Sequence, residues 1–276
     1  MTLRVSLFAG EYEALAAWTG ETREELAEEY GQHQGPLGPR ELWLAWSGER
    51  IVGMLRPWLR PDGRHALYFG PCEPDAYPAL IAQIEGECYM TVDAANTGLV
   101  AQCTELGFRV ERTEYLYEIP VTLFEAPVPP GLEIISAAGT ELEQLMALDC
   151  ALRGDIPGSS GWQPDPVWFR EENYDSPHFD PEAYLVALDR EEYVGLVRVW
   201  NGPRPLPRLG MIGVLAGYRR RGLAMSLIGQ AFAALHSRGA TVVTAEVDAT
   251  NVASNSLLGG LGGKVVGTEV ELRREA

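Results

Sequence analysis

The sequence predicts a chain built from two related α/β domains. Two observations lead to this fold class: a pattern of strands and helices that occurs twice, and a proline-rich segment, residues 119–131, that separates the two occurrences. A length of 276 residues is comfortable for two domains, and a hydrophobic content of 46% lets each of them bury a core. The chain is therefore expected to fold as a duplicated structure.

The first repeated feature is a β-hairpin. Before the separating segment, Trp43-Leu44-Ala45-Trp46 leads through a polar turn to residues 52–58, and after it residues 184–187 lead through a polar turn to residues 194–200. Each stretch is apolar and rich in β-branched or aromatic residues, which predicts two paired strands. Gly53 and Gly195 hold equivalent positions in the two hairpins.

The second repeated feature is the motif Val-Asp-x-x-Asn, followed by Leu-Gly. It occurs at Val92–Asn96 with Leu106-Gly107, and again at Val247–Asn251 with Leu261-Gly262, with one constant separation between the copies. Because this separation exceeds that of the two hairpins, the second copy is longer between hairpin and motif. We therefore expect a shortened first domain over residues 1–126 and a complete second domain over residues 127–276.

The longer copy contains a strand, a glycine-bearing loop, a helix and a second strand. Residues 209–214 and 241–247 have strand character, and leucines and alanines recur at helical spacing from Leu223 until Arg238-Gly239. The unpaired N–H groups and the dipole at the start of such a helix attract anions. In the first copy, a strand over residues 64–69 is followed by Gly70–Pro78, whose three prolines and two carboxylates are unsuited to phosphate.

Composition excludes several classes of function. The net charge is −17, with 39 acidic against 22 basic side chains, which argues against nucleic acid and anionic membranes as partners. The acidity could attract a cationic substrate or serve solubility alone. We expect a cytoplasmic protein with reduced cysteines, since no apolar run could span a membrane and no signal peptide is recognisable. The scattered histidines and cysteines predict no metal site.

The segment Arg219-x-x-Gly222-x-Ala224 resembles the signature of the GNAT superfamily of N-acetyltransferases, Arg/Gln-x-x-Gly-x-Gly/Ala. Asn251 with Leu261-Gly262, and Asn96 with Leu106-Gly107-Phe108, resemble the second motif of that family. The resemblance implies a tandem-GNAT arrangement with a degenerate N-terminal copy. It further implies an α/β (α+β) fold in which each domain has a mixed, mostly antiparallel central sheet flanked by helices.

The resemblance also implies acetyl-CoA as co-substrate and assigns residues to it. Backbone groups of two strand residues would bind the pantetheine arm, the loop would hold the pyrophosphate, and two residues of the last helix would face the cofactor. Taken as simple local structure, the three arginines could instead form a solvated turn, and Asn251 could be a plain N-cap. The implied cofactor residues are Ile212, Val214, Arg219, Arg220, Arg221, Gly222, Leu223, Ala224, Asn251 and Ser254.

The acid and base of the reaction are not apparent from the resemblance. Leu258 stands where the family often has a tyrosine, Gly263 replaces the aromatic residue after Leu-Gly, and Arg208 stands where some relatives carry a glutamate base. Asp248 and Glu246 are the carboxylates nearest the expected reaction centre and are our catalytic candidates. A turn-forming aspartate and a strand-edge charge are the alternative interpretations. Three tyrosines remain unranked as proton donors: Tyr174, Tyr184 and Tyr193.

The sequence therefore predicts an enzyme that transfers an acetyl group from acetyl-CoA to the amine of a small molecule. Polyamine-like or aminoglycoside-like acceptors suit the acidic balance, but amino acids and peptide N-termini are equally open, and the oligomeric state is not predicted. An acyl-CoA-binding sensor without turnover is the alternative, favoured by the missing tyrosine. In either case the first half could be a structural partner that completes the acceptor site.

Overall fold

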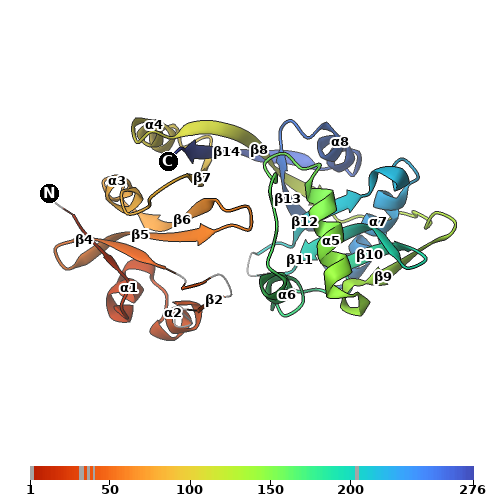
Figure 1. The fold of residues 1–276 in the computed structure, drawn as a ribbon, viewed down its shortest axis with the longest axis horizontal. Coiled ribbons are helices and arrows are strands. Elements are labelled where there is room, and N and C mark those ends of the chain that lie inside the picture. Colours follow the sequence, from red (N-terminus) through yellow and green to blue (C-terminus); the bar gives the residue numbers. More distant parts are fainter. Residues whose placement is uncertain (1–2, 31–33, 36–37, 40, 203–204) are drawn as a thin grey trace. The chain divides into compact units, whose positions relative to one another are not determined.

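A computed structural model of the chain describes residues 3–30, 34–35, 38–39, 41–202 and 205–276. The chain divides into two compact units: unit 1 comprises residues 1–112 and 270–276, and unit 2 comprises residues 113–269 (Figure 1). The sequence repeat, by contrast, divides the chain near Ala126. The difference arises because the last strand of the first copy enters unit 2 at Thr113, and the last strand of the second copy enters unit 1 at Val270.

Unit 1 has a central sheet with helices on its two sides. Its strands lie in the order β1 (Arg4–Leu7), β4 (Trp43–Ser47), β5 (Arg50–Leu59), β6 (His65–Cys72), β7 (Cys88–Asp93) and the end of β14 (Lys264–Arg274). Helices α1 (Tyr12–Thr19) and α2 (Arg23–Tyr30) lie on one side and α3 (Ala76–Ile81) on the other in Figure 1, and α3 shares a core cluster with α4 (Thr97–Glu105). The short strands β2 (Gln34–Gly35) and β3 (Gly38–Pro39) pair with each other.

Unit 2 repeats this plan and has two helices that are longer than any described helix of unit 1. Its strands lie in the order β8 (Arg109–Pro120), β13 (Val242–Asp248), β12 (Arg208–Val214), β11 (Glu192–Trp200), β10 (Tyr184–Asp189) and β9 (Leu132–Ser136). Helices α7 (Leu223–Ser237) and α8 (Val252–Gly260) share one core cluster, and α5 (Leu142–Arg153) and α6 (Pro166–Asn173) share another. The 3-10 turns η1 (Ala137–Gly139) and η2 (Ala216–Tyr218) complete the unit.

The predicted fold class is confirmed, because both sheets are mixed, mostly antiparallel and flanked by helices. The parallel neighbours are β6 with β7 and β12 with β13. Helix α7 begins and ends where its apolar spacing predicts, and it buries Leu223, Leu227 and Leu235 in the core. The flanking strands lie within one residue of their predicted bounds.

Strand register supports the duplication. Both predicted hairpins are present. Ala45 pairs with Gly53 in the first and Ala187 pairs with Gly195 in the second, and a β-bulge follows each pair. Helices α4 and α8 begin and end at equivalent positions of the two copies. The shortening of the first copy falls at the helix that follows the parallel strand: α3 has 6 residues where α7 has 15.

The two hairpin glycines avoid close contacts with different neighbours. A Cβ on Gly53 would lie 2.9 Å from Cβ of Ala76 in α3, whereas one on Gly195 would lie 3.0 Å from the carbonyl oxygen of Gly213 in β12 and at an ordinary 3.5 Å from Leu227 in α7. Contacts below about 3 Å force a displacement. Glycine therefore lets the helix approach the sheet in unit 1, and in unit 2 it relieves a close contact with the neighbouring strand.

Within the described ranges, no helix combines the length and the apolar character needed to cross a bilayer.

Candidate active site

In unit 2, strands β12 and β13 are paired at one point and then diverge. Arg208 pairs with Thr244, and the described parts of both strands show no further registered pair towards their ends at Val214 and Asp248. Beyond Arg208, β12 is held by β11 on its other edge, where Ile212 pairs with Val197. The edge of β12 that faces the gap can therefore offer backbone groups to a ligand.

The loop after β12 leads into the first turn of α7. Arg220 and Gly222 have positive φ angles of 62° and 88°, so the chain reverses just before Leu223. No described side chain caps the helix, and nothing lies within 4 Å of a Cβ built on Gly222. The first-turn N–H groups and the space beside them thus fit an anionic group such as a pyrophosphate.

The three arginines of the loop have different surroundings. Arg219 donates from Nε to the carbonyl oxygen of Val214, 2.7 Å away, and forms an ion pair with Asp155. The guanidinium of Arg221 lies 5.5 Å from the ring centroid of Tyr218. Arg220 is exposed, and its side chain forms no hydrogen bond, ion pair or ring contact with another described residue. Arg219 therefore stabilises the loop itself, and Arg220 is available for a ligand.

Asn251 and Asn255 organise the start of α8. Asn251 accepts from the N–H of Ser254 at 3.1 Å, which is the N-cap arrangement. Asn255 was not predicted as a site residue. Its amide donates to the carbonyl oxygens of Asp248 and Asn251, and its Oδ1 accepts from the hydroxyl of Tyr117 at 2.9 Å. The sequence contained a signal for Asn255, because this residue follows Asn251 by four positions and a spacing of four places two side chains on one face of a helix.

Both catalytic candidates take part in local contacts. Asp248 is 5% exposed, and its Oδ1 accepts from the N–H and the hydroxyl of Thr250, an arrangement typical of an Asx turn. Glu246 forms an ion pair with Arg208, with an Oε2–Nε distance of 2.5 Å. Asp248 lies at the divergent end of β13 and Glu246 two residues nearer the paired end. Their carboxylates are thus placed near the gap and already bind neighbouring groups.

The three candidate tyrosines surround a different part of unit 2. Tyr174 shares a hydrogen bond of 2.8 Å with Thr140, and Tyr193 accepts from the N–H of Glu141 at 3.0 Å. Tyr184 is 1% exposed, and burial raises its pKa to about 12, so it keeps its proton near neutral pH. All three lie in or against the cluster formed by α5 and α6.

Beside these tyrosines lies a buried ionic network that the sequence analysis did not anticipate. Arg198 donates from Nη1 to Asp149 at 3.0 Å and to Asn173 at 2.7 Å, and Asp149 also binds Nε of Arg153 at 2.5 Å. Asp149 is 0% and Arg198 5% exposed. The network joins α5, α6 and β11.

Leu258 stands where the family often has a tyrosine. It is 1% exposed and packs in the core.

Comparison with solved structures shows the same fold over the whole chain. A GCN5-related N-acetyltransferase from Sphaerobacter thermophilus has a TM-score of 0.72 and 18% identity, covering 99% of this chain and 95% of that one. A tandem GNAT protein from the clavulanic acid biosynthesis pathway has a TM-score of 0.69 and 13% identity, covering 99% and 98%. A comparison with curated proteins gives no significant match.

Residues 151–262 match the acetyltransferase (GNAT) family. That range includes the diverging strands, the arginine loop and the start of α8. The similarity to this family thus covers residues 151–262, and the similarity in fold to GNAT structures covers nearly the whole chain.

Proposed function

We propose that this protein transfers an acetyl group from acetyl-CoA to the amine of a small molecule, and that unit 2 carries the reaction. The observation that carries the proposal is the uncapped start of α7, preceded by the left-handed residues Arg220 and Gly222, beside the diverging strands β12 and β13. This combination offers N–H groups to phosphates and a strand edge to an extended amide chain. Coenzyme A contains both of these groups, the phosphates and the extended amide chain.

The residues proposed to hold acetyl-CoA fall into three groups. Ile212 and Val214 contribute backbone groups of β12, although the carbonyl oxygen of Val214 already accepts from Arg219. Residues 219–224 contribute N–H groups and charge, chiefly through Arg220 and Arg221. Asn251 and Ser254 contribute the start of α8.

In the proposed reaction the amine nitrogen bonds to the acetyl carbonyl carbon and loses one proton. The carbon–sulfur bond breaks, and CoA leaves as a thiolate that takes up a proton to give the free thiol. Alignment of the two reactants alone supplies several kcal/mol. Asp248 is proposed to bind the ammonium form of the acceptor or to take its proton through water, with Glu246 as the second candidate. A cationic acceptor suits the net charge of −17.

The test is the release of free CoA thiol from acetyl-CoA in the presence of a broad panel of amines. We expect amine-dependent release, lost in a Gly222→Glu variant. Acetyl-CoA binding without release by any amine would favour the sensor, because the loop would then hold the cofactor without supporting turnover.

A further inference from the structure

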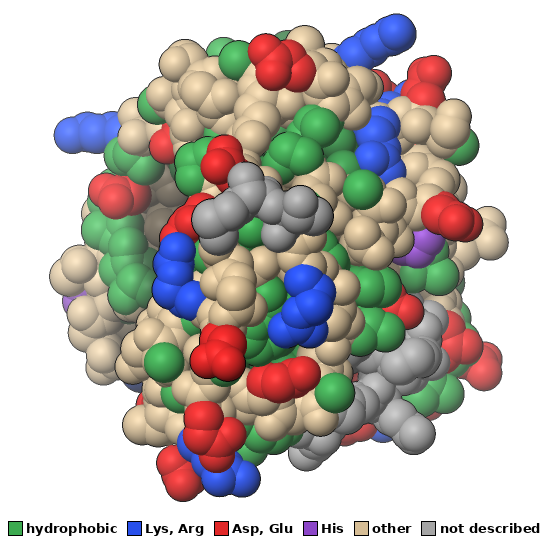
Figure 2. All heavy atoms as spheres, turned by 90° about the vertical axis from the view of Figure 1, so that its left-hand side faces the viewer, with side chains coloured by type: hydrophobic (Ala, Val, Ile, Leu, Met, Phe, Trp, Pro, Cys, Tyr) green, Lys and Arg blue, Asp and Glu red, His purple; other side chains and the backbone are tan. Residues whose placement is uncertain are grey.

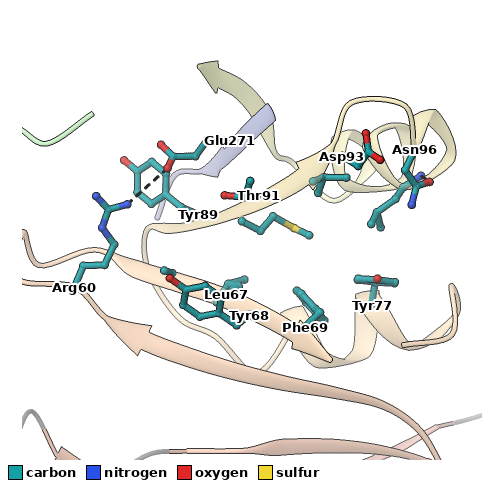
Figure 3. A pocket seen from close by; sticks show the side chains of 14 residues that line it. Arg60, Leu67, Tyr68, Phe69, Tyr77, Tyr89, Thr91, Asp93, Asn96 and Glu271 are labelled. Carbon is teal, nitrogen blue, oxygen red and sulfur yellow. Dashed lines mark hydrogen bonds and ion pairs between the residues drawn. The ribbon is translucent and has the colours of Figure 1, made fainter. Parts of the chain in front are cut away.

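Unit 1 contains a cavity of about 300 Å³ between β6 and β7 (Figure 3). All of its lining residues belong to unit 1. These strands are paired at His65–Cys88 and Ala66–Tyr89 and then diverge. In the sequence repeat, the pair Ala66–Tyr89 is equivalent to the pair Arg208–Thr244, so the cavity occupies the position that the proposed cofactor site has in unit 2.

The lining of the cavity differs from the equivalent surface of unit 2. Tyr68 lines the cavity where the second copy has Gly210, and Leu99 lines it where the second copy has Ser254. The first copy thus replaces a glycine and a serine by an aromatic and an aliphatic side chain. A site lined in this way is suited to a compact, partly apolar ligand.

The end of β6 and the segment after it also exclude a pyrophosphate. Pro71, in β6, and Pro74, after it, have no N–H to donate. Glu73 is held in place by an ion pair with Arg50, with an Oε1–Nη1 distance of 2.6 Å. Asp75 precedes α3 and adds a second negative charge. Coenzyme A would therefore meet carboxylates where unit 2 offers arginines.

The charges at one end of the cavity are paired with one another. Glu271 is 4% exposed and accepts from Nε and Nη2 of Arg112, at 2.9 and 3.0 Å, and its Oε2 lies 3.6 Å from Nη1 of Arg60. Arg60 also pairs with Asp62 at 2.9 Å, and Arg64 lies 3.8 Å from the same carboxylate. Each carboxylate at this end thus has guanidinium partners, and Figure 3 shows Arg60 and Glu271 of this group on the left.

The charge at the opposite end is not balanced. Figure 3 places Asp93, Asn96 and Tyr77 there, away from Arg60. Asp93 is exposed, and its Oδ1 accepts from the N–H of Ala95 at 2.9 Å; no cation of the described chain pairs with it. The ring centroids of Tyr77 and Phe69 lie 4.7 Å apart, and Figure 3 places both rings on the opposite wall of the cavity from Asp93. A cavity that has a carboxylate on one wall and aromatic rings on the other attracts a cation and repels an anion.

We propose that the cavity of unit 1 binds a small amine, with its ammonium group at Asp93 and its apolar or aromatic body against Tyr68, Phe69 and Tyr77. The site is separate from the acetyl-transfer site of unit 2 and makes the first copy a ligand-binding domain. Burial raises the pKa of Tyr77 to about 12, so its hydroxyl stays neutral and able to donate near pH 7.

Calorimetric titration of the full chain with three probes tests this assignment: 2-phenylethylamine, 2-phenylethanol and phenylacetate. The three probes share an aromatic ring on a short alkyl chain and differ in the charge of the polar group. We expect one 2-phenylethylamine per chain, weaker binding of the alcohol and none of the anion. Asp93→Asn should lower the affinity for 2-phenylethylamine about fivefold, which corresponds to the loss of one solvent-exposed ion pair. The matched control Asp75→Asn removes a charge outside the cavity and should leave the affinity unchanged.

Leu99→Trp fills the cavity and should remove the binding site in a chain whose thermal unfolding remains cooperative. Gly222→Glu should keep amine binding, so a failure of the proposed acetyl transfer leaves this test intact. Tighter binding of phenylacetate, or no binding of any probe, overturns the proposal. So does amine binding that is weakened by Asp248→Asn and not by Asp93→Asn, because the probe would then occupy unit 2.

Discussion

Nε of Arg219 donates a hydrogen bond to the carbonyl oxygen of Val214, 2.7 Å away, and so ties the start of the arginine loop to the end of β12. The same guanidinium forms an ion pair with Asp155. This residue therefore holds the loop in shape before any ligand arrives. Its neighbour Arg220 has a left-handed backbone and an exposed side chain that forms no hydrogen bond, ion pair or ring contact with another described residue. The consecutive arginines have separate roles.

Arg219→Ala and Arg220→Ala should consequently have different effects. Loss of Arg219 should lower both the thermal stability and the affinity for acetyl-CoA, because the loop loses two contacts. Loss of Arg220 should weaken acetyl-CoA about fivefold, about 1 kcal/mol, with thermal stability unchanged. Calorimetry at two salt concentrations checks this, since only a phosphate contact makes the lost affinity depend on salt. Identical effects of the two variants would contradict separate roles.

Gly222→Glu should abolish acetyl-CoA binding. The new carboxylate would stand at the uncapped start of α7, where the pyrophosphate is proposed to lie, and would repel it. Gly239→Glu is the matched control, because Gly239 has a similar φ of 85° but follows the other end of α7. Both variants carry the same backbone strain and charge change, so circular dichroism should show equal folding. Equal affinity of the two variants would make residues 219–224 an ordinary turn.

The parts of the fold that depend on local pattern could be predicted from the sequence. The hairpins follow from paired apolar stretches joined by polar turns, and α7 follows from the spacing of Leu223, Leu227 and Leu235. The loop was recognisable because its arginines and glycine lie close together in the sequence. The start of α8 was recognisable because Asn251 precedes an apolar helix.

The contacts between distant residues could not be predicted. Tyr117 and Asn255 are 138 positions apart, and Arg112 and Glu271 are 159 apart. Both contacts depend on the passage of β8 into unit 2 and of β14 into unit 1, which periodicity along one strand does not specify. The cavity of unit 1 could not be predicted either, because the lack of a phosphate-binding loop does not indicate which side chains fill the space between β6 and β7.

The distribution of charge on the surface was also not predictable. Figure 2 shows acidic side chains scattered among basic ones on one face, which the net charge alone does not reveal.

One acetyl-CoA should bind per chain. Helix α7 follows the arginine loop, whereas α3 follows a segment with Pro71, Glu73 and Pro74. Calorimetric titration with acetyl-CoA should therefore give a stoichiometry near one, reduced to zero by Gly222→Glu. Two equivalent sites would contradict the degeneracy of the first copy.

The buried network of unit 2 should contribute strongly to stability. Arg198→Met would leave the carboxylate of Asp149 without its 3.0 Å partner in a fully buried position. We expect a loss of about 3 kcal/mol in the free energy of unfolding, seen as a lower urea midpoint at unchanged slope. The double variant Arg198→Met with Asp149→Leu removes both charges and should recover part of that loss. A double variant less stable than the single one would show that the carboxylate is stabilised mainly by Arg153.

Asp248→Asn should lower turnover at least tenfold, about 1.4 kcal/mol of transition-state stabilisation, with the affinity for acetyl-CoA unchanged. The substitution keeps the side-chain shape, and its amide oxygen can still accept from the N–H of Thr250, so the turn should persist while the charge is lost. Steady-state rates of thiol release with the best amine of the panel measure turnover, and calorimetry measures the affinity for acetyl-CoA.

Thr250→Val serves as the control for turn geometry, because it removes the hydroxyl that donates to Asp248 and leaves the carboxylate charged. If Thr250→Val slows turnover as much as Asp248→Asn, or if Asp248→Asn weakens acetyl-CoA to the same extent, Asp248 is a structural residue. Full activity of Asp248→Asn would direct the search to Glu246, where Glu246→Gln removes the ion pair with Arg208 as well as the charge.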